Sequence, residues 1–344
     1  MSQRKVSETE DAMASLIVEL SLEHRELPFL EVSEVASSLG DAIERSGSWT
    51  ALVRSERNAP HLDYCNRMAL AGSVSSLLFA DKDLEHIKDA LHTTDLPAGA
   101  YAVRVSARDR ETRKVAPVIE REMGSVIADR VSFNLKSPDR VIRIIRDGDW
   151  YCCLQMCCVD RRGFAGRHGN KRPFNLPVSL HPRLARALLN LCHVGSGTRL
   201  LDPFCGTGGI LIEGALLGSA AIGADIDARM IRGATLNLSS LGLLSACTLY
   251  NMDAGDIVKL GTFDAVVTDP PYGRSSFRTE PISSLYARAF AAISSVLREG
   301  GRLGIVLPDM SLLPRSQELR CLYHAEVKVH ASLTRHFLVF EKTS

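Results

Sequence analysis

The second half of the chain repeats one pattern, a short apolar run followed by a longer stretch in which apolar residues recur with helical spacing. Apolar runs of about four to eight residues are typical of strands buried on both faces, which in α/β folds are joined by helices. A helix over 183–191 precedes the first run, and only a short turn separates the last two runs. The predicted strands are residues 199–204, 222–226, 248–252, 263–268, 302–307, 326–330 and 337–341. We therefore expect a doubly wound, Rossmann-like sheet of seven strands whose last strand runs antiparallel to its otherwise parallel neighbours.

The first half mixes strand and helix patterns less regularly. It predicts strands at 14–20, 50–54 and 101–105, a helix that begins near Val32, helices at 62–78 and 116–129, and two strands joined by a tight Asp147-Gly148 turn. These elements divide the chain into an N-terminal α/β cap (1–48), a second α/β domain (49–160), a basic linker (161–178) and the doubly wound domain (179–344).

Length and charge agree with a multidomain enzyme. At 344 residues the chain exceeds the size at which one core usually stops growing. Its formal net charge of +1 creates no global attraction to nucleic acid, so any such binding depends on local patches. No run approaches about 18 uncharged apolar residues, and residues 1–12 are polar with both charge signs. We expect a cytoplasmic protein without a membrane partner.

The nine cysteines do not form a metal-binding pattern. Four of them, Cys152, Cys153, Cys157 and Cys158, share one apolar segment that has neither a C-x-x-C pair nor a matching second half. We interpret the segment as a strand in which cysteine serves as a small apolar side chain, and we predict no metal.

Residues 200–213 are typical of a strand, a glycine turn and a helix. Glycines at 206 and 208 let the backbone approach a ligand closely, and Asp202 lies in the strand before them. About 20 residues further on, the next strand ends in carboxylates that suit ribose hydroxyls, with Asp225 as the candidate. A dinucleotide fingerprint would need glycine in place of Leu211, and no G-x-x-x-x-G-K-[ST] loop occurs. The pattern favours a nucleoside site over hydride or phosphoryl chemistry.

The tetrapeptide Asp269-Pro270-Pro271-Tyr272 follows the apolar run 263–268. An exocyclic nucleobase amine is a poor nucleophile because its lone pair is delocalised into the ring. Asp269 and the Pro270 carbonyl can each accept one N–H of such an amine, Pro271 stiffens the corner, and Tyr272 can stack on the base. Taken alone, the tetrapeptide also fits an ordinary turn after a strand. The glycine turn upstream is what favours a catalytic role for it.

The glycine turn resembles motif I, and the tetrapeptide motif IV, of the class I S-adenosylmethionine-dependent methyltransferases that act on amino groups. The resemblance implies S-adenosylmethionine as cofactor. Asp253 is placed like the residue that accepts from the adenine amino group, with Asp256 as a competitor, and Cys205 is expected to pack in the turn. The implied cofactor-binding residues are Ser179, His181, Pro182, Asp202, Cys205, Gly206, Thr207, Gly208, Asp225, Ile226, Asp253 and Asp269.

Residues 104–160 resemble a THUMP domain, an RNA-binding module of tRNA-modifying enzymes, most clearly at 135–150. The following linker interleaves cations with Phe164, His168 and Phe174, which suits phosphate contact and stacking on unpaired bases. A solvated glycine-rich tether is the alternative. The predicted RNA-binding residues are Arg108, Arg110, Arg113, Lys114, Arg161, Arg162, Arg167, Lys171, Arg172 and Arg335.

Four segments together, at 172–187, 202–213, 269–275 and 332–335, resemble the archaeal tRNA (guanine-N2) methyltransferases that modify guanine 10. The resemblance implies a tRNA substrate and N2-methylguanosine or N2,N2-dimethylguanosine as product. Alternatives are methylation of another tRNA guanine, adenine-N6 methylation and a non-catalytic RNA-binding protein. The sequence leaves open the number of methyl groups, the oligomeric state and the need for a small activating protein partner.

Overall fold

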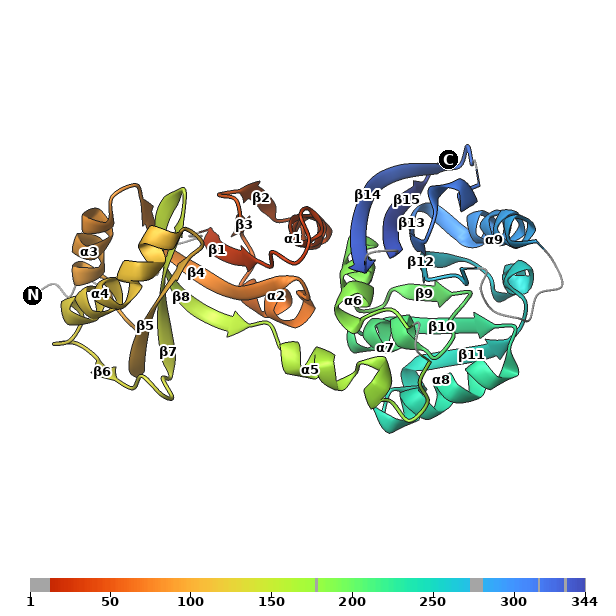
Figure 1. Cartoon of the computed structure of the whole chain (residues 1–344), viewed down its shortest axis with the longest axis horizontal. Helices are drawn as coiled ribbons and strands as arrows, with labels where there is room; N and C mark the ends of the chain where they lie inside the picture. Colours follow the sequence, from red (N-terminus) through yellow and green to blue (C-terminus); the bar gives the residue numbers. More distant parts are fainter. Residues whose placement is uncertain (1–12, 177–178, 273–280, 315, 331–332, 344) are drawn as a thin grey trace, which may run out of the picture. The chain divides into compact units, whose positions relative to one another are not determined.

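The computed structural model of the protein describes residues 13–176, 179–272, 281–314, 316–330 and 333–343, and the chain forms two compact units (Figure 1). The first unit contains residues up to Leu22 together with 36–66 and 71–159. The second contains 160–344 and two short segments from the N-terminal part, 23–35 and 67–70. The unit boundaries thus differ from the four ranges expected from the sequence. The motif residues 273–275 and Ser332 lie outside the described residues.

One sheet of eight strands, in the order β2-β3-β1-β4-β8-β7-β5-β6, builds the first unit. The strands expected in the cap and in the second domain therefore share a sheet. Its helices are α2 (His61–Arg67), α3 (Leu84–Thr93) and α4 (Arg110–Val126). Its strands are β1 (Ala14–Leu20), β2 (Ala42–Arg45), β3 (Thr50–Ser55), β4 (Ala71–Asp81), β5 (Ala100–Ala107), β6 (Ser132–Phe133), β7 (Arg140–Asp147) and β8 (Asp149–Cys158).

Two helices predicted in this unit exist, but their bounds differ from the prediction. The helix expected over 62–78 ends at Arg67, and β4 then pairs with β1 and β8 in the middle of the sheet. Pairing with two neighbouring strands in the middle of the sheet overrides the helical spacing of the leucines within 62–78. Helix α4 begins at Arg110 because the Asp109 carboxylate accepts a hydrogen bond of 2.7 Å from the Thr112 N–H. Pro117, expected near the start, lies inside the helix.

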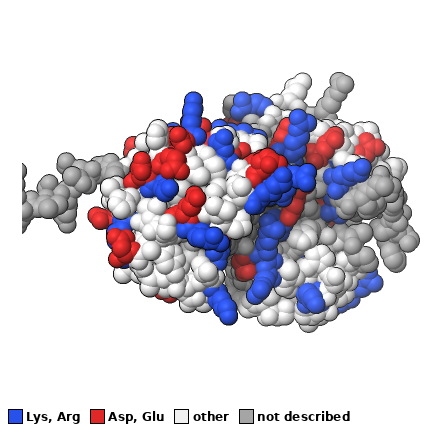
Figure 2. Space-filling view, turned by 60° about the vertical axis from the view of Figure 1, so that its left-hand side comes forward, with Lys and Arg blue, Asp and Glu red and all other residues white. Residues whose placement is uncertain are grey.

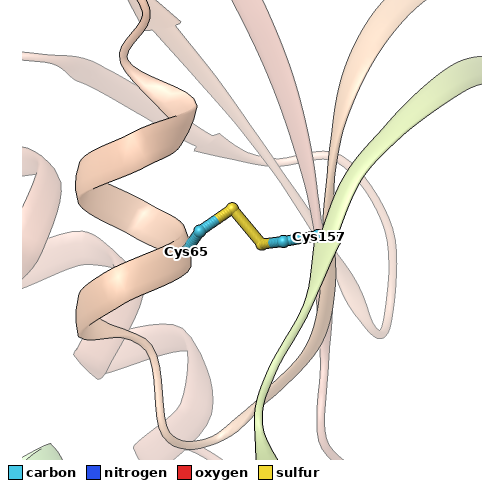
Figure 3. Close-up of a disulfide and its surroundings, with 2 residues drawn as sticks. All are labelled: Cys65 and Cys157. Carbon is cyan, nitrogen blue, oxygen red and sulfur yellow. A yellow bond between two sulfur atoms is a disulfide. The ribbon is translucent and has the colours of Figure 1, made fainter.

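The predicted hairpin is confirmed as β7 and β8, joined at Gly148, whose φ of 80° suits glycine. Cys152 and Cys153 are buried in the core as small apolar side chains. Cys157 departs from the prediction, because it forms a disulfide with Cys65 of α2 (Figure 3). The partner lies 92 residues away in the sequence, so the spacing of the cysteines did not indicate the pair.

The second unit contains the predicted doubly wound sheet, in the order β11-β10-β9-β12-β13-β15-β14. The last strand, β15, is antiparallel to both β13 and β14, as expected. Its strands are β9 (Arg199–Asp202), β10 (Ala220–Asp225), β11 (Cys247–Asn251), β12 (Phe263–Thr268), β13 (Leu297–Leu307), β14 (Leu319–His330) and β15 (Leu333–Lys342).

Helices lie on both faces of this sheet (Figure 1). Leu188 packs with Val306 in one core, and Tyr286 packs with Ile305 in the other. The helices are α5 (Arg161–Gly166), α6 (Pro182–Leu191), α7 (Gly209–Leu216), α8 (Ala228–Ser240) and α9 (Ile282–Val296), with short 3-10 turns η1 (Gly169–Lys171), η2 (Leu244–Ala246), η3 (Ala254–Leu260) and η4 (Met310–Leu312). Within the described residues, no helix is both long and apolar enough to span a membrane.

The N-terminal part of α1 (Leu27–Leu39) is built into the second unit. Leu27 and Leu70 join the core beside α6. The fully buried Glu31 carboxylate accepts hydrogen bonds from the backbone N–H groups of Ala69 and Leu70, at 3.0 and 2.8 Å, and from the side chain of Asn190 at 2.8 Å. A buried polar group with this many partners anchors the segment firmly.

Candidate active site

Three aspartates lie at the carboxyl ends of neighbouring strands. Asp202 ends β9, Asp225 ends β10, and Asp269 directly follows β12. The buried Asp202 carboxylate accepts hydrogen bonds from the Thr268 hydroxyl at 2.7 Å and the Phe204 N–H at 3.2 Å. Burial, together with the charges of Asp225 and Asp269, raises the pKa of Asp202 to about 7. This edge of the sheet therefore favours a positively charged ligand.

The glycine turn is held by Asp225. The Gly206 N–H donates to its carboxylate at 3.0 Å. Gly206 and Gly208 have φ of 51° and 81°, in the left-handed region that favours glycine. A Cβ at Gly208 would lie 3.3 Å from the Cβ of Ala234, so the turn packs directly on α8. Cys205 is buried, and burial raises the pKa of its thiol, which agrees with a packing role.

In the Asp-Pro-Pro-Tyr corner, the Tyr272 hydroxyl donates a hydrogen bond of 2.6 Å to the Asp269 carboxylate. Arg335 of β15 lies 3.8 Å from the other carboxylate oxygen, and its guanidinium stands over the Tyr272 ring at 5.5 Å. Burial raises the pKa of Asp269 to about 6, although Arg335 and the Tyr272 hydroxyl oppose the shift. The Tyr286 hydroxyl of α9 fixes the Pro271 carbonyl at 3.3 Å. Asp269 is thus a partly buried carboxylate that is mostly ionised at neutral pH.

The segment before α6 packs on the glycine turn. The Ser179 and Thr207 hydroxyls are 3.3 Å apart, and Arg172 lies 3.5 Å from the Thr207 hydroxyl. Asn237 of α8 bonds the backbone of both Thr207 and Phe174. Sequence reasoning missed Asn237, because its role depends on a loop contact 30 residues away. Ser179 thus lies beside the turn, as the resemblance implied.

The other predicted cofactor residues lie around this edge with partners of their own. Burial opposes ionisation of Asp253, but Arg288 and the Gly255 N–H outweigh it and hold its pKa below the usual value. Its competitor Asp256 pairs with Lys259 on the surface. The Ile226 side chain is 73% exposed beside Asp225. His181 caps α6, and Pro182 is the buried first residue of that helix.

The predicted RNA-binding residues divide into two groups. Those at the start of α4, together with Arg161, Arg162 and Lys171, are exposed. Lys114 pairs with Glu111, and Arg108 stands over the Trp49 ring. On the face seen in Figure 2, lysine and arginine side chains are interspersed with aspartate and glutamate. The exposed group is compatible with phosphate contact through local patches.

The second group disagrees with the prediction. Arg335 is buried beside Asp269, and Arg172 is buried beside the glycine turn. Arg167 makes a two-pronged ion pair with the fully buried Glu213, at 2.7 and 3.1 Å. The aromatic residues of this segment also pack internally, because the Phe164 ring lies under Arg167 and the Phe174 ring lies against Gly233. Buried groups do not reach an RNA backbone.

One group of side chains in the described part of the chain has the ligand types and closeness of a metal site. His324, Glu326 and His336 project from the β14–β15 pair, with ligand atoms within 4.8 Å of one another. The group lies on the β14–β15 hairpin and shares no residue with the three aspartates at the strand ends.

The sheet order, the glycine turn and the corner at Asp269 define a class I methyltransferase domain of the kind that methylates amino groups. A model of the RMKL-like methyltransferase domain family matches residues 169–336. The tRNA (guanine(10)-N2)-dimethyltransferase of Methanothermobacter thermautotrophicus is 33% identical over 341 residues, 95% of this chain and 99% of that protein. The Pyrococcus abyssi enzyme of the same name is 32% identical over 297 residues, 83% of this chain and 88% of that protein.

The chain belongs to the tRNA (guanine(10)-N2)-dimethyltransferase family. Its fold also matches the crystal structure of TrmN from Thermus thermophilus, with a TM-score of 0.57 and 23% identity over 95% of this chain and 99% of that one.

Proposed function

We propose that the protein methylates the exocyclic N2 of a guanine in tRNA, at position 10, with S-adenosylmethionine as methyl donor. The observation that carries the proposal is the corner at Asp269, where a partly buried, largely ionised carboxylate lies beside an aromatic ring and follows a nucleoside-type glycine turn. Membership of the family supports both the substrate and the reaction. The product is N2-methylguanosine, and the names of the relatives support a second methylation.

The residues present fit this cofactor. Asp225 suits the ribose hydroxyls, the exposed Ile226 side chain suits one face of an adenine ring, and the turn at Gly206 and Gly208 leaves room for the backbone to approach the ligand. When bound, S-adenosylmethionine supplies an electrophilic methyl group on a positively charged sulfur. The raised pKa values of Asp202 and Asp269 favour such a cation in this part of the site.

Asp269 orients the amine. One carboxylate oxygen and the Pro270 carbonyl accept its two N–H groups, and the base lies on the Tyr272 face that Arg335 does not cover. Since the Tyr272 hydroxyl and Arg335 both contact the carboxylate, they hold its direction before the base arrives. As N2 gains the methyl group it becomes positively charged and must lose a proton. Asp269 stabilises that charge, and Asp269 or water accepts the proton.

The first unit provides RNA binding in this proposal. Its resemblance to a THUMP domain and the exposed cations at the start of α4 support phosphate contact there. The exposed cations of α5 and η1, Arg161, Arg162 and Lys171, extend that role to the second unit. A tRNA substrate, whether mature or precursor, agrees with the expected cytoplasmic location of the protein.

Mass spectrometry of nucleosides from a tRNA transcript treated with the purified chain tests the proposal. We expect N2-methylguanosine, followed by N2,N2-dimethylguanosine at longer times, and loss of both when guanine 10 is replaced by adenine. Modification of another guanine would change the position, N6-methyladenosine would overturn the guanine assignment, and no product would support a non-catalytic protein. Product formed only after a small partner protein is added would show that activation is required.

A further inference from the structure

Arg172 is a buried cation whose hydrogen-bonding capacity is only partly used. Its side chain is 8% exposed. The Nε group donates to the Arg167 carbonyl at 2.8 Å, and Nη1 lies 3.5 Å from the Thr207 hydroxyl. The buried Nη2 group has no hydrogen-bond partner among the residues that the structure describes. A buried donor without a partner is costly, which points to a ligand that is bound during function.

The guanidinium points at the start of helix α7. Its Nη1 and Nη2 atoms lie 3.3 and 3.5 Å from the place that a Cβ of Gly209 would occupy. Gly209 is the first residue of α7 and directly follows the glycine turn. The absence of a side chain at Gly209 is what lets Arg172 approach. Backbone N–H groups at a helix start and a guanidinium fork both favour an anion.

The neighbouring acid cannot supply that anion. The Glu213 carboxylate attracts Arg172, but Arg167 donates to both of its oxygens and Arg186 lies 2.9 Å from one of them. Three guanidinium groups therefore surround one fully buried carboxylate. Glu31, the next acid near Arg186, is bound by two backbone N–H groups and Asn190. The region around Arg172 keeps an excess of positive charge.

We infer that Arg172 binds the carboxylate of the methionine part of the cofactor, between the Thr207 hydroxyl and the start of α7. The inference rests on the proposed function, because it concerns the ligand of the same site. A phosphate on the outer surface of an RNA is the poorer partner, since Arg172 is 8% exposed and lies against the glycine turn that borders the cofactor. Arg172 is then a cofactor-binding residue, although its place in a basic linker indicated RNA.

Calorimetry on the full chain tests the inference with two ligands that differ in one group. S-adenosylhomocysteine has the carboxylate, and S-adenosyl-3-thiopropylamine lacks it but keeps the ammonium and the nucleoside. We expect the unaltered protein to prefer the first by about 10- to 100-fold, which is the range for a charge-assisted contact. Arg172→Gln should remove most of that preference by weakening only S-adenosylhomocysteine. Arg298→Gln, which deletes an exposed cation of the same unit, should leave both affinities unchanged.

The outcomes separate the two claims. If the unaltered protein binds neither ligand, the proposed function fails and the inference fails with it. If the protein binds S-adenosylhomocysteine but Arg172→Gln keeps the full preference, or weakens both ligands equally, the inference alone is overturned. Should Arg172→Gln show no cooperative melting transition, Arg172→Lys serves instead. Lysine keeps the charge but lacks the planar fork of arginine, so the preference for S-adenosylhomocysteine should fall only partly in this variant. An undiminished preference would count against Arg172.

Discussion

Two basic segments of the protein use their cations in opposite ways. At the start of α4, Arg108, Arg110, Arg113 and Lys114 all face solvent. In the segment 161–172, two of the arginines turn inward toward Glu213 and the glycine turn. Both segments are similarly rich in cations, so the density of charge in the sequence does not tell which ligand they serve. Burial separates cations that pack against Glu213 and the glycine turn from cations that stay exposed to solvent.

The largest expected effect belongs to Asp269, the partly buried carboxylate of the Asp-Pro-Pro-Tyr corner. Asp269→Ala should lower kcat by about 100- to 1,000-fold, because the amine loses the acceptor that orients it and stabilises its developing charge. Affinity for S-adenosylhomocysteine should change little, since Asp269 is directed at the base. Single-turnover methylation of tRNA and calorimetry measure the two quantities. Wild-type turnover in this variant would contradict the assignment of the site.

Glu31 should show how much a buried charge contributes to stability. Glu31→Ala leaves two backbone N–H groups and the Asn190 side chain without their acceptor, and each unsatisfied group costs about 1–3 kcal/mol. We expect the free energy of unfolding to fall by about 3–5 kcal/mol in urea titration. The matched control is Glu44→Ala, which removes one member of an exposed pair with Arg54 and should cost about 0–1 kcal/mol. Equal losses would show that burial is not the deciding factor.

Arg335 should act through the pKa of Asp269. The pKa of Asp269 is about 6, and the reaction needs the ionised form, so the rate should fall as the pH drops through about 6. Arg335 lowers that pKa, hence Arg335→Gln should move the acid limb to higher pH. Tyr272→Phe should move it in the same direction, because it deletes a hydrogen bond to the carboxylate. A pH–rate profile of each variant measures the shift, and Lys171→Gln should leave the limb in place.

The exposed cations should have the smallest individual effects. Arg110→Gln and Arg113→Gln should each weaken tRNA binding a few-fold and reduce the salt dependence by about one counterion per lost contact. Filter binding at several salt concentrations measures the slope. Affinity for S-adenosylhomocysteine should be unchanged in both variants. A slope identical to that of the unaltered protein would place the RNA on another surface.

The sequence by itself determined the doubly wound sheet, the antiparallel last strand, the glycine turn and the Asp-Pro-Pro-Tyr corner. These follow from local signals, because apolar periodicity, glycine and proline restrict the backbone within a few residues. The sequence also carried the resemblance that the comparisons confirmed at the level of the family. Local signals were weaker in the first unit, where central pairing made a strand of 71–81.

Only the tertiary structure decided which partners distant side chains have. Arg335 of β15 contacts Asp269, which lies 66 residues earlier in the chain, and Cys65 forms a disulfide with Cys157. Helix α1 contributes Glu31 to the second unit. It also decided which arginines of 161–172 turn inward. An inward arginine and an exposed arginine carry the same charge, so the sequence does not distinguish them. The physical reason is that burial, pKa and ion pairing depend on packing between segments whose separation along the chain is large, and a sequence pattern records only neighbours.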